Sequence, residues 1–178
     1  ITHEWPHWTA DAGRFASLYS INNPNAKTMF SICWSTARAA QALLSAYKAT
    51  GGEEILEAAK KAMRYVETCQ IDSRFLAEKY QGGCREETPL CEDIAFRDTI
   101  EAIQGYINLY LATEEKDYLN KAVFSADFIY RMHLDIGTFP HHYFNVLTHK
   151  YSECKFDWGR VVISAEALMF SQLNKLLG

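Results

Sequence analysis

Apolar residues recur every three to four positions through the middle of the chain, first within residues 96–110 and again within 119–129. This spacing places them on one face of an α-helix. The sequence between the two runs, Ala-Thr-Glu-Glu-Lys-Asp, is short and polar enough to reverse the chain. The pattern predicts a hairpin of two antiparallel helices over about residues 94–132.

The same pattern recurs 63 residues away in both directions. Tyr110 of the central hairpin matches Tyr47 before it and Leu173 after it. One equivalent place holds alanine in all three copies, at Ala39, Ala102 and Ala165. A small residue at such a place favours the close approach of two helices. The recurrence predicts an architecture of repeated helical hairpins.

Outside the central hairpin, hydrophobic spacing predicts four further helices. They cover residues 11–20, 35–49, about 53–68 and 160–177. Gly51 and Gly52 lie between the second and the third, as glycines do where a helix ends. Long connections over about 69–92 and 131–156 join the hairpins. Alternating aromatic and polar residues within 139–151 predict a short β-hairpin in the second connection.

The predicted fold class is therefore all-α. We expect antiparallel helical hairpins with a repeat of about 63 residues, forming an arc or part of a ring, as a single domain over residues 1–178. The last predicted helix has no partner helix after it in the sequence. We expect further hairpins of the same chain, or a second copy in a homo-oligomer, to cover its outer face.

Composition and charge narrow the classes of function. The chain is 48% hydrophobic and 22% charged, which is typical of soluble globular proteins, and its net charge is −4. It has no basic stripe that could release phosphate counterions, which argues against a nucleic-acid partner. No apolar run is long enough to span a membrane, and the first residues do not resemble a signal peptide. The compartment is left open.

The cysteines do not indicate a bound metal. The chain has five, an odd number, with no CxxC or CxxH spacing. Neither a disulfide framework nor a zinc site is indicated, so we expect no metal and no cofactor. A bridge between Cys84 and Cys91 is one alternative, and buried free thiols are the interpretation that the sequence favours.

Two segments carry a resemblance to a known superfamily. They are ALLSAYKATGGEEILEAAKKAMRYV and GYINLYLATEEKDYLNKAVFSADFIYRMHLDIGTFP. Their inner helix, short turn, outer helix and following Gly-x-Phe segment resemble the (α/α) toroid superfamily, the six-hairpin glycosidase-like proteins. The resemblance covers about residues 33–178. It implies inner helices at 35–49, 97–112 and 160–175, and an active site at their N-terminal pole.

Acidic residues at that pole are the candidates for catalysis. Glycoside hydrolysis needs two carboxyl groups across the scissile bond, one of them able to stay protonated. The candidates are Asp93 and Asp98 before and within the central helix, either of them paired with Asp157 before the last helix. The expected function is that of a glycoside hydrolase acting on plant or bacterial polysaccharide fragments.

Other residues near the pole are candidates for substrate binding. Trp34 and Trp158 could stack on a sugar face, and Arg97 or Arg160 could hold a uronate carboxylate. The loops that lead to the pole add His141, His142 and Tyr143.

Each assignment has a structural alternative. The acids could stabilise helix N-termini, and the arginines could form structural ion pairs. Two other functions also remain open: a sugar epimerase, which would use His141 or His142 to move a proton, and a non-enzymatic α-solenoid that binds a partner protein. The fold alone does not choose between them.

Overall fold

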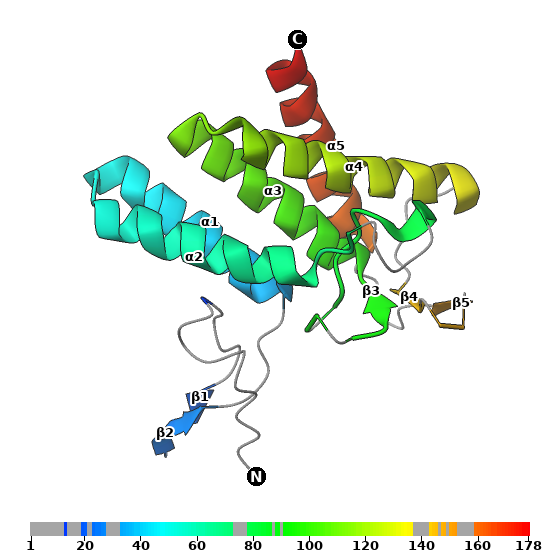
Figure 1. The fold of residues 1–178 in the computed structure, drawn as a ribbon, viewed down its shortest axis with the longest axis horizontal. Coiled ribbons are helices and arrows are strands. Elements are labelled where there is room, and N and C mark those ends of the chain that lie inside the picture. The colour runs from blue at the N-terminus through cyan, green and yellow to red at the C-terminus, as the bar shows by residue number, and fades with distance from the viewer. Residues whose placement is uncertain are drawn as a thin grey trace.

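Five α-helices dominate the part of the chain that the computed structural model describes (Figure 1). The described residues are 13, 19–20, 23–27, 33–72, 78–86, 88–89, 91–136, 143–145, 147–148, 150–152 and 159–178. The helices are Cys33–Thr50 (α1), Glu53–Cys69 (α2), Phe96–Thr113 (α3), Lys116–Ile136 (α4) and Gly159–Leu177 (α5). None of the described helices combines the length and the apolar character needed to cross a membrane.

The helices repeat at a fixed interval along the chain. The helices α1, α3 and α5 begin at residues 33, 96 and 159, and α2 and α4 begin at residues 53 and 116, so each interval is 63 residues. The predicted hairpins and the predicted last helix are thereby confirmed. The turn after α3 contains Glu114 in the left-handed conformation, and its N–H donates to the carbonyl of Tyr110 at 2.7 Å. This geometry ends the helix as a C-terminal glycine would.

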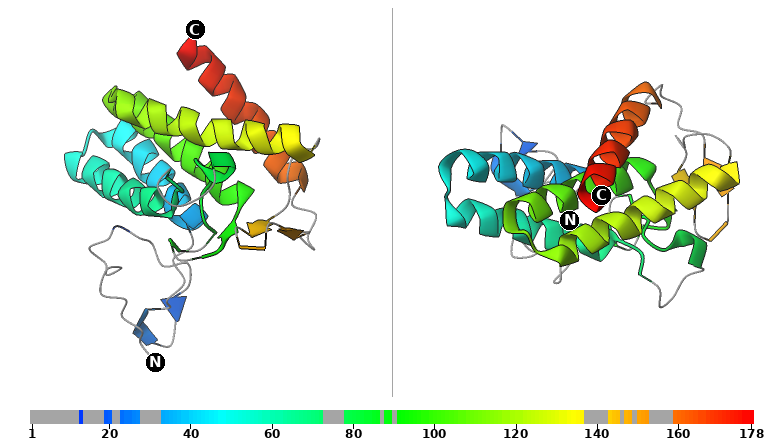
Figure 2. Two further views of the ribbon diagram at one scale, coloured as in Figure 1. Left: turned by 45° about the vertical axis from the view of Figure 1, so that its right-hand side comes forward. Right: turned by 90° about the horizontal axis from the view of Figure 1, so that it is seen from above.

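The helices pack around an apolar core. The helix α1 packs on α2 and on α3, and α3 in turn packs on α4 and on α5. The short turns lie at one end of the hairpins, while the strands at 93–94, 143–145 and 150–152, which belong to the segments joining the hairpins, lie near the other end (Figures 1 and 2). The largest fully buried side chains are Tyr80, Tyr106, Phe128, Met63, Ile94, Ile103, Ile107, Leu109, Ile129, Met132 and Met169. They come from both hairpins, from the connection between them and, in the case of Met169, from α5.

The interface between α1 and α3 differs in register from that between α3 and α5. Arg38 pairs with Glu101, the residue at its own position one repeat later. Gln104 instead bonds to Gln172, five residues beyond its own equivalent. The repeat in the sequence is therefore regular, whereas the packing of the third copy is not. In Figure 1, α5 diverges from α3 toward the C-terminus.

Two small antiparallel sheets accompany the helices. The strands Tyr19–Ser20 (β1) and Asn23–Lys27 (β2) form one pair. The strands Asp93–Ile94 (β3), Tyr143–Asn145 (β4) and Lys150–Ser152 (β5) form the other sheet in the order β3-β4-β5. The predicted β-hairpin within 139–151 is confirmed by the pairing of β4 with β5, which extends one residue further. The sequence did not predict β3. It precedes α3 directly and, through its pairing with β4, connects the two long loops.

The predicted helix over residues 11–20 is wrong at its C-terminal end. Tyr19 and Ser20 lie in β1, where Ser20 pairs with Asn23 and Tyr19 pairs with Lys27. Asn22, Asn23 and Pro24 follow after Ile21 in the sequence, and residues of these types favour turns over helices. The chain therefore returns on itself as a hairpin.

The expected alanine position is buried in one of the three copies, and a glycine on α3 marks another close contact between helices. Ala102 is fully buried, but Ala39 is half-buried, and the side chain of Ala165 lies outside the described part of the chain. On α3 the helices also approach closely at Gly105, where an added Cβ would lie 2.6 Å from Sδ of Met63 on α2. Glycine at this position lets α3 approach the side chains of α2.

The connection between α2 and α3 is anchored on α4 at Gly82, which lies just after the 3-10 turn Glu78–Tyr80 (η2). Gly82 has φ of +89°, and a Cβ there would lie 2.3 Å from the backbone oxygen of Phe124. The N–H of Gly82 donates to the carbonyl of Ile71 at 2.9 Å, and its own carbonyl accepts a hydrogen bond from Oγ of Ser125 at 2.8 Å. Only glycine satisfies both the backbone angle and the space.

Replacement of Gly82 by alanine should destabilise the protein much more than the same change at Gly51. Gly51 also has a positive φ, +71°, but an added Cβ there meets no atom within 4 Å. We expect Gly51→Ala to lower the free energy of unfolding by about 1–2 kcal/mol, the cost of the left-handed backbone. Gly82→Ala should lower it by at least about 3 kcal/mol because the clash adds to this cost. Urea unfolding measures both, and equal effects would contradict the anchoring role of Gly82.

Candidate functional site

Polar side chains of α1, α3 and α5 gather around one hollow of about 560 Å³. Six of its eight lining residues are polar: Arg38, Gln41, Glu101, Gln104, Asn108 and Gln172. A second hollow of about 370 Å³ shares Gln41 and Asn108 with the first and continues toward the C-terminal ends of α1 and α3. These six residues and the two hollows form the polar groove. It begins at the second turn of the helices, beyond the N-terminal pole where the sequence placed the site.

Glu101 is the centre of the hydrogen bonding in the polar groove. One carboxylate oxygen accepts from Nε of Arg38 at 2.8 Å, and the other accepts from Nε2 of Gln41 at 3.1 Å. The Glu101 side chain is 11% exposed and that of Arg38 is 55% exposed. Because the arginine is largely in water, the ion pair contributes only about 0.5–1 kcal/mol to stability. Its main effect is to hold the carboxylate in a fixed position at the edge of the hollow.

Trp34 on α1 lies against arginine side chains. The guanidinium carbon of Arg97 is 3.5 Å from the centre of the Trp34 ring, and that of Arg38 is 5.7 Å from it. Cation–π contacts of this kind contribute about 0.5–2 kcal/mol each. Trp34 and Arg97 were both predicted to bind substrate, and the structure places them on each other. Because Trp34 lies on α1 and Arg97 on α3, their contact helps to hold these two helices together.

Asp98 is buried beneath the first turn of α1. It is 1% exposed, and its Oδ1 accepts the N–H of Trp34 at 2.9 Å. A helix N-terminus has unpaired N–H groups and is the positive end of the helix dipole. A carboxyl group from the neighbouring helix can accept a hydrogen bond from one of these N–H groups, and its negative charge interacts favourably with the dipole. Burial raises the pKa of the Asp98 carboxyl well above its ordinary value, and the hydrogen bond from Trp34 offsets part of this effect. A raised pKa suits a general acid, but the carboxyl group of Asp98 does not reach the polar groove in this structure.

The remaining predicted residues are only partly described. Asp93 lies in β3, is half-buried, and accepts the side-chain amide of Asn145 at 2.9 Å. Tyr143 lies in β4 and Arg160 in the first turn of α5, but their side chains are outside the described part of the chain. Four other predicted residues lie entirely outside the described part of the chain: His141, His142, Asp157 and Trp158. The pairing of Asp93 or Asp98 with Asp157 stays a prediction.

The sequence carries a signal for Glu101 in the charges of the repeat. Arg38 and Glu101 carry opposite charges at the same position of successive repeats, which predicts an ion pair wherever the two helices that carry them are neighbours. Two of the amide residues carry a similar signal, because Gln41 and Gln104 are 63 residues apart and occupy the same position of successive repeats, whereas Gln172 has no such counterpart. Gln41, Gln104 and Gln172 each occupy ordinary polar positions on helices, and only the packing of α1, α3 and α5 brings them together.

The cysteines divide into a buried group and one half-buried residue. Cys33, Cys69, Cys84 and Cys91 are all free thiols, so Cys84 and Cys91 do not form a bridge. Cys33, Cys69 and Cys84 are fully buried, and the contacts of Cys33 with the other two thiols, together with burial, raise the pKa of the Cys33 thiol. Buried thiols of raised pKa are poor nucleophiles. Of the described cysteines, Cys91 is therefore the most accessible to reagents.

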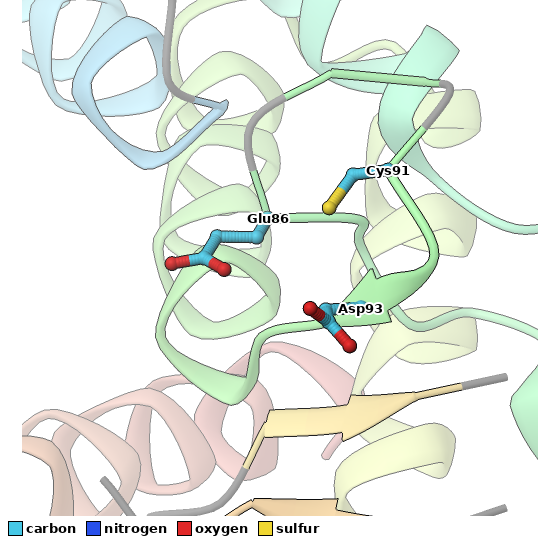
Figure 3. A group of neighbouring side chains, drawn as sticks. All are labelled: Glu86, Cys91 and Asp93. Carbon is cyan, nitrogen blue, oxygen red and sulfur yellow. The ribbon is translucent and has the colours of Figure 1, made fainter. Parts of the chain in front are cut away.

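One group of side chains could hold a metal ion among the described residues. Glu86, Cys91 and Asp93 each offer one donor atom, and these atoms lie within 4.8 Å of one another. Figure 3 shows the three side chains around the loop that joins Glu86 to Asp93, with the sulfur of Cys91 directed back across the loop. The spacing in the sequence, Glu-x4-Cys-x-Asp, is not a recognised ligand pattern, which explains why the sequence did not predict it.

The comparisons with known proteins add no family. No protein-family model matches the chain. No curated protein is significantly similar to it. The function is therefore argued from the geometry of the described residues.

The buried carboxyl of Asp98 should make stability depend on pH. Its folded-state pKa is raised above the ordinary value of 3.8, so the folded protein binds the proton more tightly than the unfolded chain does. The resulting stability is fully present below about pH 4 and is lost as the pH rises through the folded-state pKa. Asp98→Asn keeps an acceptor for the Trp34 N–H but cannot ionise. We expect its free energy of unfolding, relative to the unsubstituted protein, to increase from pH 4 toward neutrality.

Urea unfolding at a series of pH values measures this difference. Asp98→Ala, which removes the acceptor as well, should be less stable than Asp98→Asn at every pH by about 1 kcal/mol. Glu53→Gln, at an exposed position in the first turn of α2, is the matched control. If the free energy of unfolding changes with pH in the same way for the unsubstituted protein and for Asp98→Asn, the raised pKa of the buried Asp98 carboxyl is contradicted.

Proposed function

We propose that the chain binds an oligosaccharide in the polar groove and hydrolyses a glycosidic bond there. The observation that carries this proposal is the set of four amide side chains in one hollow: Gln41, Gln104, Asn108 and Gln172. Each amide offers two N–H donors and a carbonyl acceptor. Sugar hydroxyl groups also donate and accept, so such a set matches a sugar better than it matches an apolar or strongly charged ligand.

Apolar surface beside the amides supports the same ligand class. Leu168 lines the first hollow and is 57% exposed, and Leu111 lines the second and is 58% exposed. Binding sites combine apolar contact area with a few placed polar groups. The C–H faces of sugar rings can pack on these leucines while their hydroxyl groups meet the amides.

Glu101 is the carboxylate best placed to act on a ligand in the polar groove. It lies one helical turn beyond Asp98 on α3, and it lines the hollow, which Asp98 does not. A carboxylate held by Arg38 and Gln41 is suited to the role of base or nucleophile. Hydrolysis needs a second carboxyl group as the acid. We assign that role to Asp157, which precedes α5 in the sequence.

The arrangement of the helices also supports the proposal. The helix starts repeat every 63 residues, and the short turns lie opposite the long connections. Both features are expected for part of an (α/α) toroid, in which further hairpins or another copy complete the ring around the groove. The amides of the groove favour a sugar ligand, and no described residue gives comparable support to an epimerase or a protein-binding solenoid.

Oligosaccharides should raise the unfolding temperature of the chain, because a ligand that binds only the folded state stabilises it. A panel of neutral and uronate-containing oligosaccharides, tested by thermal unfolding, identifies the class that binds. Gln104→Ala should weaken binding about three- to tenfold, the effect of one lost hydrogen bond. Glu101→Gln should keep binding but lower turnover by at least about a hundredfold, as measured by release of reducing ends.

Asn120→Ala is the matched control, because Asn120 is an exposed amide on α4 away from the groove. It should change neither binding nor turnover. The proposal is wrong if no oligosaccharide raises the unfolding temperature, or if Gln104→Ala and Asn120→Ala change oligosaccharide binding to the same extent. If the unsubstituted protein binds an oligosaccharide but does not hydrolyse it, the proposed hydrolase activity is wrong and only carbohydrate binding by the groove is supported.

A further inference from the structure

The segment that leads from α2 into α3 folds into a tight loop between two paired backbone segments. Arg85 forms a β-bridge with Ile94, and the N–H of Glu86 donates to the carbonyl of Asp93 at 2.9 Å. Glu86 and Asp93 are therefore directly opposite each other at the base of the loop. Side chains at such positions lie on the same face of the paired strands.

Cys91 completes a group of three donors. Its N–H donates to the carbonyl of Thr88 at 2.9 Å, and its own carbonyl accepts a hydrogen bond from the guanidinium of Arg85. These two bonds hold the residue within the loop, with its sulfur near the two carboxylates. The donor atoms of Glu86, Cys91 and Asp93 lie within 4.8 Å of one another, and all three residues are half-buried (Figure 3). A solute can therefore reach the group.

We propose that Glu86, Cys91 and Asp93 form a zinc site with a fourth position for water. The chemical types of the three donor atoms indicate which metal the site would bind. A thiolate is a soft ligand that Mg²⁺ and Ca²⁺ do not prefer, whereas Zn²⁺ accepts sulfur and carboxylate oxygen together. With Zn–S of about 2.3 Å and Zn–O of about 2.1 Å, the donors of a tetrahedral site lie roughly 3.5 Å apart, so these need to draw together by about an ångström.

An outer partner already orients one of the ligands. Asn145 of β4 donates its side-chain amide to Oδ1 of Asp93 at 2.9 Å. The oxygen of the same amide accepts the N–H groups of Leu147 and Thr148 at 3.1 and 2.9 Å, which fixes the orientation of the amide. Carboxylate ligands of metals are commonly held by hydrogen bonds of this kind. The other oxygen of Asp93 is left for the metal.

The site assigns a different role to Asp93 from the catalytic one expected from the sequence. As a ligand, Asp93 would fasten the loop before α3 rather than act as an acid. Zinc would then connect the loop 86–93 to β4 through Asp93 and Asn145, at the pole of the helices where the long connections meet. The site is separate from the polar groove, and the proposal does not depend on the sugar-binding function.

Alkylation of Cys91 tests the site in the unsubstituted full chain. The protein is stripped of metal with a chelator and treated with iodoacetamide, with and without Zn²⁺, and modification at each cysteine is measured by peptide mass spectrometry. Cys33, Cys69 and Cys84 are fully buried, so they should react slowly in both conditions. Zn²⁺ at saturation should slow the modification of Cys91 at least about tenfold, because a coordinated thiolate is no longer free to react.

Variants then identify the ligands. Isothermal titration with Zn²⁺ should give one site, and Cys91→Ser and Asp93→Asn should each weaken binding at least about tenfold. Asn145→Ala should weaken it about tenfold through loss of the outer partner. Glu92→Gln is the matched control, because Glu92 is an exposed carboxylate in the same loop outside the donor group. Cobalt(II) in place of zinc should show a thiolate-to-metal charge-transfer band that disappears in Cys91→Ser.

Two results would overturn the proposal. One is a rate of Cys91 alkylation that saturating Zn²⁺ does not change. The other is Zn²⁺ binding that is as tight in Cys91→Ser as in the unsubstituted chain, or a cobalt band that persists there, since the thiolate would then come from another cysteine. The alkylation measurement needs no variant, so a failure of any variant to fold does not prevent the test.

Discussion

The direct packing of α1 on α3 is the constraint on which the rest of the structure depends. It brings residues one repeat apart into contact, so that Arg97 lies on Trp34 and Glu101 pairs with Arg38. It also places the carboxyl of Asp98 at the start of α1. Fully buried alanines along α1 and α2, and a glycine on α3, allow these helices to approach. Without this interface the polar groove would lose Arg38 and Gln41, the side chains that α1 contributes to its first hollow.

The helices could be predicted from the sequence because their cause is local. Hydrophobic residues at intervals of three and four, glycines after α1 and a polar turn after α3 act within a few residues of the elements they define. The repeat adds a second constraint, since each helix start is supported by another one 63 residues away. The β-hairpin of β4 and β5 was predictable for the same reason, from alternation within its own segment.

The parts that could not be predicted depend on contacts between distant segments. The strand β3 has two residues, and it exists because Asp93 pairs with Asn145 and Ile94 with Phe144. The burial of Asp98 follows from the placement of α1 over it, which its own sequence neighbourhood does not encode. The groove amides come from three helices.

The group of Glu86, Cys91 and Asp93 illustrates the same limit at short range. Glu86 and Asp93 are seven residues apart, and no motif associates them with Cys91 between them. Their proximity depends on the β-bridge between Arg85 and Ile94, and Asp93 itself lies in the strand that pairs with β4. A spacing rule could not find this group, because the geometry of the loop is set by the strands that enclose it.

The opposite charges of Arg38 and Glu101 have a consequence for assembly. In a chain of similar hairpins, the first helix of any hairpin could in principle pack beside the first helix of any other, and exchange between like copies is a common error in repeat proteins. A positive charge on one copy and a negative charge at the same position on the next distinguish the two helices from each other. The correct order of copies places the charges together, whereas a helix like α1 beside another helix like α1 would place arginine against arginine. A pair that adds little to stability therefore helps to define which hairpins are neighbours.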